Sequence, residues 1–296
     1  MPDLPPSDHC DGKRFHNVEP TPHGTPAKLL RWALTRKPGP WGPYRDEPPG
    51  PPPPARVERG IRVTMVGHAT LLVQTAGLNL LTDPIWSARC SPVAWAGPRR
   101  RRPPGVAFDD LPRIDAILLS HDHYDHLDLP TLRRLRERDD PTVFTGLGNA
   151  ARLRPAGLHA VHELDWWDAA SLGPLDVHAV PARHFSGRTP FDRDQTLWLG
   201  LWVRGPAGSV LFAGDTGLGP HFEQIHARLG APDVALLPIG AFRPRWFMRP
   251  IHMSPAEAVQ AHLTLRAGVT VPMHYGTFPL ADDGFDEPPR ELRAAL

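Results

Sequence analysis

The pattern of apolar residues changes near residue 55. Beyond that point, short runs rich in leucine and β-branched residues recur as far as residue 273, separated by Gly, Pro, Asn and Asp. Runs of this kind are typical of β-strands. Strands are therefore predicted at residues 61–66, 70–75, 78–82, 115–120, 142–145, 176–180, 197–203, 210–213, 234–238 and 270–273. Ala76-Gly77 is short enough to join two of them as a hairpin.

Residues that favour helix ends predict two helices between these strands. The first follows the N-cap candidate Asp128 and has three leucines on one face, Leu129, Leu132 and Leu135. The second starts at Pro220 and stops at Gly230, and its apolar side consists of Phe222, Ile225 and Leu229.

A third helix has the most complete set of end signals. Ser254 is its N-cap and Glu257 its third residue, which together form a capping box. Pro255 fits the first turn and Gly268 the stop, and the expected inward side chains are Val259 and Leu263. Strands in succession, followed by strands alternating with helices, indicate mixed sheets covered by helices.

Residues 1–55 are rich in proline and glycine and end in a run of prolines that favours neither a helix nor a central strand. We expect an N-terminal arm at 1–55 and one body at 56–296. Residues 29–34 are long enough for one or two helical turns, and Trp32 and Trp41 are candidates to pin the arm onto the body. A loosely attached tail is the alternative.

The amino-acid composition of the chain excludes several classes of protein function. The chain has 296 residues, of which 41% are hydrophobic, so it can bury a substantial core and is not wholly disordered. Its 33 basic residues nearly balance its 32 acidic ones, so the chain has no strong positive electrostatic field that would favour nucleic acid as a partner. Cys10 and Cys90 cannot form a disulfide framework for a domain of this size, which favours a reducing, cytoplasmic compartment. No segment approaches the roughly 20 apolar residues of a membrane span, whereas peripheral membrane contact stays open.

Histidine, present 16 times, is the side chain most often recruited by transition metals. Residues 121–126 read His-Asp-His-Tyr-Asp-His and directly follow a predicted strand, a position where α/β folds build sites. If the chain stays extended, His121 and His123 point the same way while Asp125 and His126 turn elsewhere. That arrangement suits two adjacent ions better than one. A solvated loop that happens to be rich in histidine is the alternative.

Three later residues extend this pattern. His184, Asp215 and His274 each follow an apolar strand-like run. Strand ends converge at one edge of a sheet, so we expect these side chains to meet the 121–126 loop. Histidines such as His9 and His221 lack this context and are expected at the surface or hydrogen-bonded in the core.

These residues carry a resemblance to a known family. Residues 121–126 match the His-x-His-x-Asp-His signature of the metallo-β-lactamase superfamily, and His184, Asp215 and His274 fit the spacing of its later motifs. Within that superfamily the chain resembles the N-acylphosphatidylethanolamine-hydrolysing phospholipase D branch. The matching segments are residues 67–70, 81–85, 120–127, 163–167, 212–217, 238–241, 244–248 and 274–278.

The resemblance implies an α+β fold, a four-layer αββα sandwich with two mixed β-sheets, and a dinuclear site for two Zn²⁺ ions. The implied ligands are His121, His123 and His184 for one ion, Asp125, His126 and His274 for the other, and Asp215 as the bridge. Asp83 is expected to orient a ligand or the bridging water, and a plain turn residue before Pro84 is the alternative. Manganese or iron suits the same donors.

Zinc lowers the pKa of bound water from about 15.7 to about 7, so a hydroxide shared by two ions would be the nucleophile. Asp125 is therefore counted as catalytic, together with His252. His252 precedes the N-cap of a helix, where phosphate is favoured, and is expected to bind phosphate or to protonate the leaving alkoxide. Tyr124 is expected to face the substrate, and Trp246 to offer a lipid apolar surface, with core packing as its alternative.

The leading hypothesis is a zinc phosphodiesterase of the phospholipase D type. It would act on N-acylphosphatidylethanolamine or a related phospholipid, or on another small phosphodiester, and release phosphatidic acid and an N-acylethanolamine. The rivals are a lactonase or sugar-phosphate hydrolase with the same dinuclear site, and a flavodiiron-like electron carrier, although the latter usually has more acidic ligands. A non-enzymatic binding protein would not need all seven ligands. Peripheral membrane association and a homodimer are compatible with the sequence.

Overall fold

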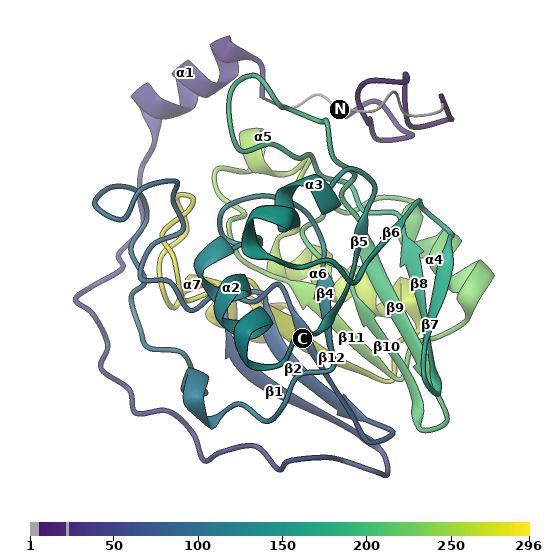
Figure 1. Cartoon of the computed structure of the whole chain (residues 1–296). Coiled ribbons are helices and arrows are strands. Elements are labelled where there is room, and N and C mark those ends of the chain that lie inside the picture. The colour runs from purple at the N-terminus through teal and green to yellow at the C-terminus, as the bar shows by residue number, and fades with distance from the viewer. Residues whose placement is uncertain (1–5, 22–23) are drawn as a thin grey trace.

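Two six-stranded β-sheets form the centre of the computed structural model, which describes residues 6–21 and 24–296 (Figure 1). The first sheet has the order β1-β2-β3-β4-β5-β6, with β1 (Ile61–Gly67), β2 (Thr70–Thr75), β3 (Leu78–Thr82), β4 (Ala116–Leu119), β5 (Thr142–Gly146) and β6 (Val161–Leu164). The second has the order β12-β11-β10-β9-β8-β7, with β7 (Ala169–Leu172), β8 (Leu175–Val180), β9 (Gly200–Gly205), β10 (Gly208–Phe212), β11 (Val234–Pro238) and β12 (Val269–Met273).

Both sheets are mixed, as expected. Strands β1 to β3 pair antiparallel and β3 to β6 pair parallel. In the second sheet, β7 to β10 pair antiparallel and β10 to β12 pair parallel. The inner faces share one apolar core, which contains Leu71 and Leu118 from the first sheet and Val177, Leu201 and Phe212 from the second. Burial of this surface holds the sheets face to face.

Helices cover the two outer faces, which completes the predicted αββα sandwich. The first sheet is covered by α2 (Leu129–Arg138) and α3 (Ala150–Leu153), and the second by α4 (His221–Leu229) and α6 (Pro255–Leu265). The remaining helices are α1 (Pro26–Thr35), α5 (Arg245–Met248) and α7 (Glu287–Ala295). Short 3₁₀ turns occur at Phe108–Asp110 and Arg154–Ala156. No helix in the described part of the chain is long and apolar enough to cross a membrane.

The elements that the sequence did not predict have weak local signals. Strands β6 and β7 lie at the edges of their sheets, are four residues long and are only partly buried, so they lack an apolar run. Helix α7 begins at Glu287, and the next two residues, Pro288 and Pro289, look like helix breakers but are tolerated in a first turn. Strand β9 starts at Gly200 rather than at Leu197.

Helix α6 confirms its predicted capping box, and of its two predicted inward residues Val259 is half-buried whereas Leu263 is not buried. The Ser254 side chain accepts a hydrogen bond from the Glu257 N–H, and the Glu257 carboxylate accepts one from the Ser254 N–H. Leu263 is 67% exposed, and the residues buried along the helix are Pro255, Ala258, Ala261 and Leu265. Small alanines let the helix lie close to the sheet, so the larger Leu263 is on the outer side. The helix ends at Arg266, whose φ is +52°, before Gly268.

The N-terminal arm is attached to the body at several points. Cys10 and Phe15 are buried in the core between the sheets. Helix α1 lies at the same end of the molecule as α5 (Figure 1), and its Trp32 stacks on Phe247 with ring centroids 5.3 Å apart. The Trp41 indole N–H donates to the Asp283 carbonyl at 2.9 Å. The two tryptophans therefore have the pinning role expected of them.

His9 links the arm to Asp165 of the body. Its imidazole lies 2.6 Å from both the Asp8 and the Asp165 carboxylates. Burial alone lowers the pKa of His9, but these carboxylates raise it above its ordinary value of 6.5. Burial likewise opposes ionisation of Asp165, yet the contact with His9 lowers the pKa of that carboxyl below 3.8. The charged pair is therefore fully present between pH 3.8 and pH 6.5, the ordinary pKa values of the two groups. It is lost as pH rises through the raised pKa of His9.

We expect limited proteolysis to cut the arm more slowly just below pH 6.5 than at a pH well above the raised pKa of His9. A His9→Gln variant should lose this difference, whereas a His16→Gln variant, changed at an exposed neighbour, should keep it. Equal cutting of the unchanged protein at both pH values would mean that the pair does not hold the arm.

Candidate metal centre

All seven predicted metal ligands lie together where strands of both sheets end. The 121–126 loop follows β4 of the first sheet. His184, Asp215 and His274 follow β8, β10 and β12 of the second sheet. Every one of these side chains is buried or half-buried. The convergence of strand ends therefore brings together residues that are far apart in the sequence.

Three imidazoles form the first group. His121 Nε2 lies 2.8 Å from His123 Nδ1, and His184 Nε2 lies 3.3 Å from the same atom. Burial is the main reason that the pKa values of His121 and His184 are well below the ordinary value for histidine. The three nitrogens therefore face one another in neutral rings, whose lone pairs can bind a cation.

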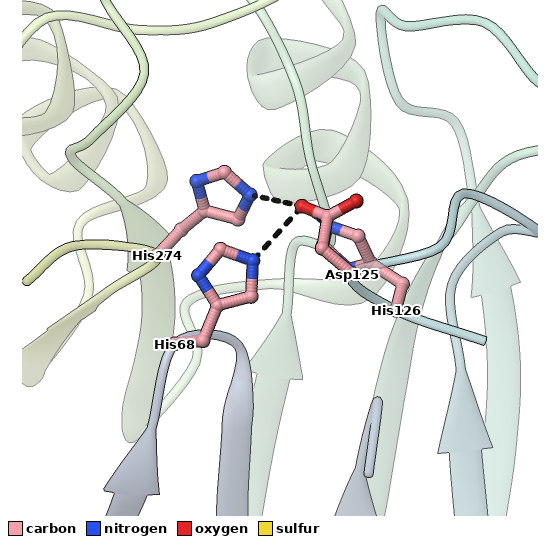
Figure 2. A group of neighbouring side chains, drawn as sticks. All are labelled: His68, Asp125, His126 and His274. Carbon is pink, nitrogen blue, oxygen red and sulfur yellow. Dashed lines mark hydrogen bonds and ion pairs between the residues drawn. The ribbon is translucent and has the colours of Figure 1, made fainter. Parts of the chain in front are cut away.

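Two carboxylates and two imidazoles form the second group, and Figure 2 shows three of its members together with His68. His126 Nε2 lies 3.2 Å from both Asp125 Oδ2 and Asp215 Oδ2. His274 Nε2 lies 3.3 Å and 3.1 Å from the same two oxygens. Asp215 Oδ2 also lies 3.8 Å from His184 Nε2 of the first group. Asp215 thus stands between the two groups, at the place where the sequence resemblance expects a bridge.

The polar atoms of this cluster fit bound metal ions. Within the described residues, Asp215 Oδ1 is buried without a hydrogen-bond partner, and the contacts of His126 Nε2 are with the Asp125 and Asp215 carboxylates. Leaving such an atom unsatisfied costs roughly 1–3 kcal/mol, more when the group is charged. Imidazole nitrogen and carboxylate oxygen are the donors that zinc and related transition ions prefer. A cation is therefore the natural partner of atoms that the protein itself leaves unpaired.

Asp83 holds His126 from outside the two groups. One of its oxygens accepts a hydrogen bond from the Ser120 backbone N–H at 2.7 Å. The other lies 2.5 Å from both Ser120 Oγ and His126 Nδ1. Because Nδ1 is held in this way, Nε2 of His126 faces Asp125 and Asp215. These contacts agree with the orienting role expected for Asp83.

His68 belongs to the cluster although the sequence analysis did not single it out. Its Nε2 lies 2.9 Å from Asp125 Oδ2, and its ring centroid is 4.1 Å from that of His274 (Figure 2). Its backbone carbonyl accepts a hydrogen bond from the His274 N–H at 2.8 Å. His68 lies in the turn between β1 and β2 with φ at +59°. Its position at the end of a strand was the signal that could have identified it.

Asn17, from the arm, supports the ligand His184 through its backbone. The Asn17 amide donates to the His184 carbonyl at 2.9 Å and accepts from the His184 N–H at 3.2 Å. The Trp198 indole N–H also donates to Asn17 Oδ1, at 3.1 Å. Asn17 is buried, so water does not compete for these bonds. No local pattern in the arm marks this residue, because its role depends on a segment 167 positions away.

A cleft of about 350 Å³ opens over the ligand atoms. His252 lies in it, with Nδ1 3.9 Å from Asp215 Oδ2 and its ring against His184 and His274. One wall of the cleft is apolar and consists of Leu29, Trp32, Phe185, Phe247, Met248, Ile251 and Leu280. The cleft thus joins a polar, ligand-rich floor to an apolar wall, part of which comes from α1.

Two predicted substrate-contacting residues lie outside this cleft. Trp246 is 41% exposed, is covered by the Arg31 guanidinium and lines a neighbouring hollow, whereas the adjacent Phe247 lines the cleft itself. Tyr124 lines a separate cavity. The structure therefore brings His252, but not Tyr124 or Trp246, to the candidate metal ligands.

Comparison with known proteins agrees with this arrangement. A family model described as a beta-lactamase superfamily domain matches residues 78–275. An uncharacterized protein of Mycobacterium tuberculosis is 45% identical over 240 residues, 79% of this chain and 64% of that protein. The chain thus spans just under two thirds of that relative's length. His68 and Asn17 both precede the segment that the family model covers.

Two further proteins carry functional names. The N-acyl-phosphatidylethanolamine-hydrolyzing phospholipase D 1 of Caenorhabditis elegans is 37% identical over 246 residues, 79% of this chain and 69% of the worm enzyme. The solved structure of Igni18, a metallo hydrolase from the archaeon Ignicoccus hospitalis, has a TM-score of 0.60 at 26% identity and covers 79% of this chain and 91% of its own. The likeness to Igni18 agrees with a fold built around a metal centre.

The contacts of Asn17 predict that the arm tunes metal affinity. An Asn17→Ala variant removes both hydrogen bonds to the His184 backbone, and loss of such an outer contact typically weakens metal binding about 10- to 100-fold. Competition with a chromophoric chelator measures this affinity directly. Val18→Ala, at the exposed next position, is the matched control and should bind zinc as the unchanged protein does. An Asn17→Ala protein that is folded and keeps full affinity would contradict this role.

Proposed function

This chain belongs to the metallo-β-lactamase superfamily of metal-dependent hydrolases, and from that premise we propose that it is a phosphodiesterase of the phospholipase D type. Its substrate is N-acylphosphatidylethanolamine or a related phospholipid, which it cleaves to phosphatidic acid and an N-acylethanolamine. The observation that carries this proposal is the cleft that joins the ligand cluster to an apolar wall. The activity for which the 37% identical worm enzyme is named supports it.

The proposed cofactor is a pair of zinc ions. We assign His121, His123 and His184 to one ion and Asp125, His126 and His274 to the other, with Asp215 between them. The two groups of converging ligand atoms support this division. Bound zinc lowers the pKa of a water ligand from about 15.7 to about 7, which supplies a nucleophile near neutral pH.

The shape of the cleft favours an amphiphile. A phosphate group suits the polar floor, and an acyl chain suits the wall formed by α1, α5 and the segment around Leu280. Burying an apolar chain contributes about 0.8 kcal/mol for each CH₂ group. Arg193 lines the same cleft and adds a positive charge toward the phosphate. A lipid substrate also implies peripheral contact with a membrane.

His252 is proposed to contact the phosphate. Its ring lies between His184, His274 and the open cleft, and its Nδ1 has no hydrogen-bond partner among the described residues. Burial lowers the pKa of His252 to about 4, so the ring is neutral at physiological pH. A neutral imidazole can donate a hydrogen bond to a phosphate oxygen. This favours binding and orientation of the phosphate over protonation of the leaving alkoxide.

The zinc-loaded protein should release phosphatidic acid from N-acylphosphatidylethanolamine in mixed micelles, measured by mass spectrometry. His252→Ala removes a hydrogen bond to the reacting phosphate and should lower kcat about 10²- to 10³-fold. Asp125→Asn should be inactive because it removes the charge of a proposed ligand. His262→Ala changes a histidine of α6 that contacts Thr270 instead of the cleft, and its activity should be unchanged.

A lactone substrate assayed in parallel separates the proposed reaction from its nearest rival. Ring opening without release of phosphatidic acid would identify a lactonase on the same metal centre and contradict the phospholipase assignment. Full phosphodiesterase activity in folded His252→Ala would leave the reaction intact but refute the role of His252.

A further inference from the structure

A second cavity is lined in part by Tyr124 of the metal loop. It has a volume of about 560 Å³ and is bounded by residues 87–94, the start of α2 and Arg188. Tyr124 lines this cavity, whereas its neighbours His123 and Asp125 line the metal cleft. The two spaces share no lining residue and are therefore separate.

Three arginines line this cavity without a carboxylate partner. Arg89, Arg133 and Arg188 take part in no ion pair within the described ranges 6–21 and 24–296. Other arginines nearby are paired, since Arg134 lies 3.7 Å from Asp109 and Arg152 lies 2.6 Å from Asp192. No ion pair therefore neutralises these three guanidinium groups, of which Arg89 donates to the Gly97 carbonyl and Arg133 to the Pro155 carbonyl.

The cavity has one acidic residue, and its oxygens are already occupied. Asp128 Oδ1 accepts a hydrogen bond from Ser87 Oγ at 2.8 Å, and Oδ2 accepts one from Thr131 Oγ1 at 2.5 Å. The Ser87 backbone N–H also donates to Oδ2, at 3.3 Å. Asp128 therefore holds the surrounding loop and does not neutralise the three guanidinium groups.

Arg188 presents a fixed guanidinium to the cavity. Its Nη1 donates to the backbone carbonyls of Asp122 at 2.7 Å and Leu127 at 2.9 Å. Its guanidinium carbon lies 3.8 Å from the centroid of the Tyr124 ring. A guanidinium held in this way loses little freedom when it binds an anion, and its planar donors match phosphate and carboxylate oxygens.

We propose that this cavity binds a phosphate group that is attached to an apolar body, at a site separate from the metal centre. The three arginines provide the charge, and Val93, Leu127 and Leu129 provide apolar surface for the rest of the molecule. The volume exceeds what a bare phosphate ion needs. The phosphate belongs either to a free amphiphile or to the headgroup of an anionic lipid in a membrane.

The test compares one double variant of the metal-loaded protein with two controls. Arg89→Ala combined with Arg133→Ala removes two charges of the cavity and leaves Arg188 to hold the metal loop. Arg134→Ala removes one charge at the next position of α2, where the side chain is paired outside the cavity, and is the first control. Protein treated with a chelator is the second control, because any phosphate bound to the metals is lost there. Circular dichroism verifies that each protein is folded.

Isothermal titration calorimetry with octyl phosphate measures binding of a free amphiphile. Co-sedimentation with phosphatidylcholine vesicles, with or without phosphatidic acid, measures binding to an anionic lipid headgroup in a membrane. In at least one of these assays, the double variant should bind at least tenfold more weakly, since it lacks two charged donors to the phosphate. Arg134→Ala and the chelated protein should bind as the unchanged protein does. Equal binding by the double variant in both assays, or loss of binding on chelation alone, would overturn the proposal.

Discussion

Mutual burial of imidazole and carboxylate groups is the constraint on which the rest of the structure depends. Six histidines and three aspartates, counting His68 and Asp83, contact one another in the interior with little water to solvate them. Polar groups packed in this way are costly unless cations or hydrogen bonds satisfy them. The sheets supply rigid strand ends, and the loops after β4, β8, β10 and β12 carry the donors. Rigid elements of this kind keep converging ligand atoms in place before a metal binds.

The support for this cluster extends beyond the segment matched by the family model. His68 links Asp125 to the backbone of His274, and Asn17 links the arm to the backbone of His184. Both contacts fix the position of a candidate metal-ligating residue, and neither involves the substrate. Helix α1 additionally contributes Leu29 and Trp32 to the cleft wall. The arm is therefore part of the site, and variation in it can change both metal affinity and the fit of a substrate.

The sequence predicted most of the fold and the positions of the seven candidate ligands, because apolar strand runs and the residues that follow them are local signals. It did not predict β6 and β7, whose edge positions need few apolar residues. It was wrong about Leu263 as an inward residue of α6, where buried alanines carry less hydrophobic signal than this exposed leucine. Asn17 could not be predicted, since its function arises only from a long-range contact with His184.

The most direct test is the metal content of the purified protein, measured by elemental analysis after exposure to zinc and removal of unbound metal. We expect two zinc ions per chain in the unchanged protein. Asp215→Ala should retain fewer, because Asp215 Oδ2 lies near nitrogen atoms of both ligand groups. A folded protein that retains no metal, or one in which Asp215→Ala leaves the zinc content unchanged, would contradict a paired metal centre.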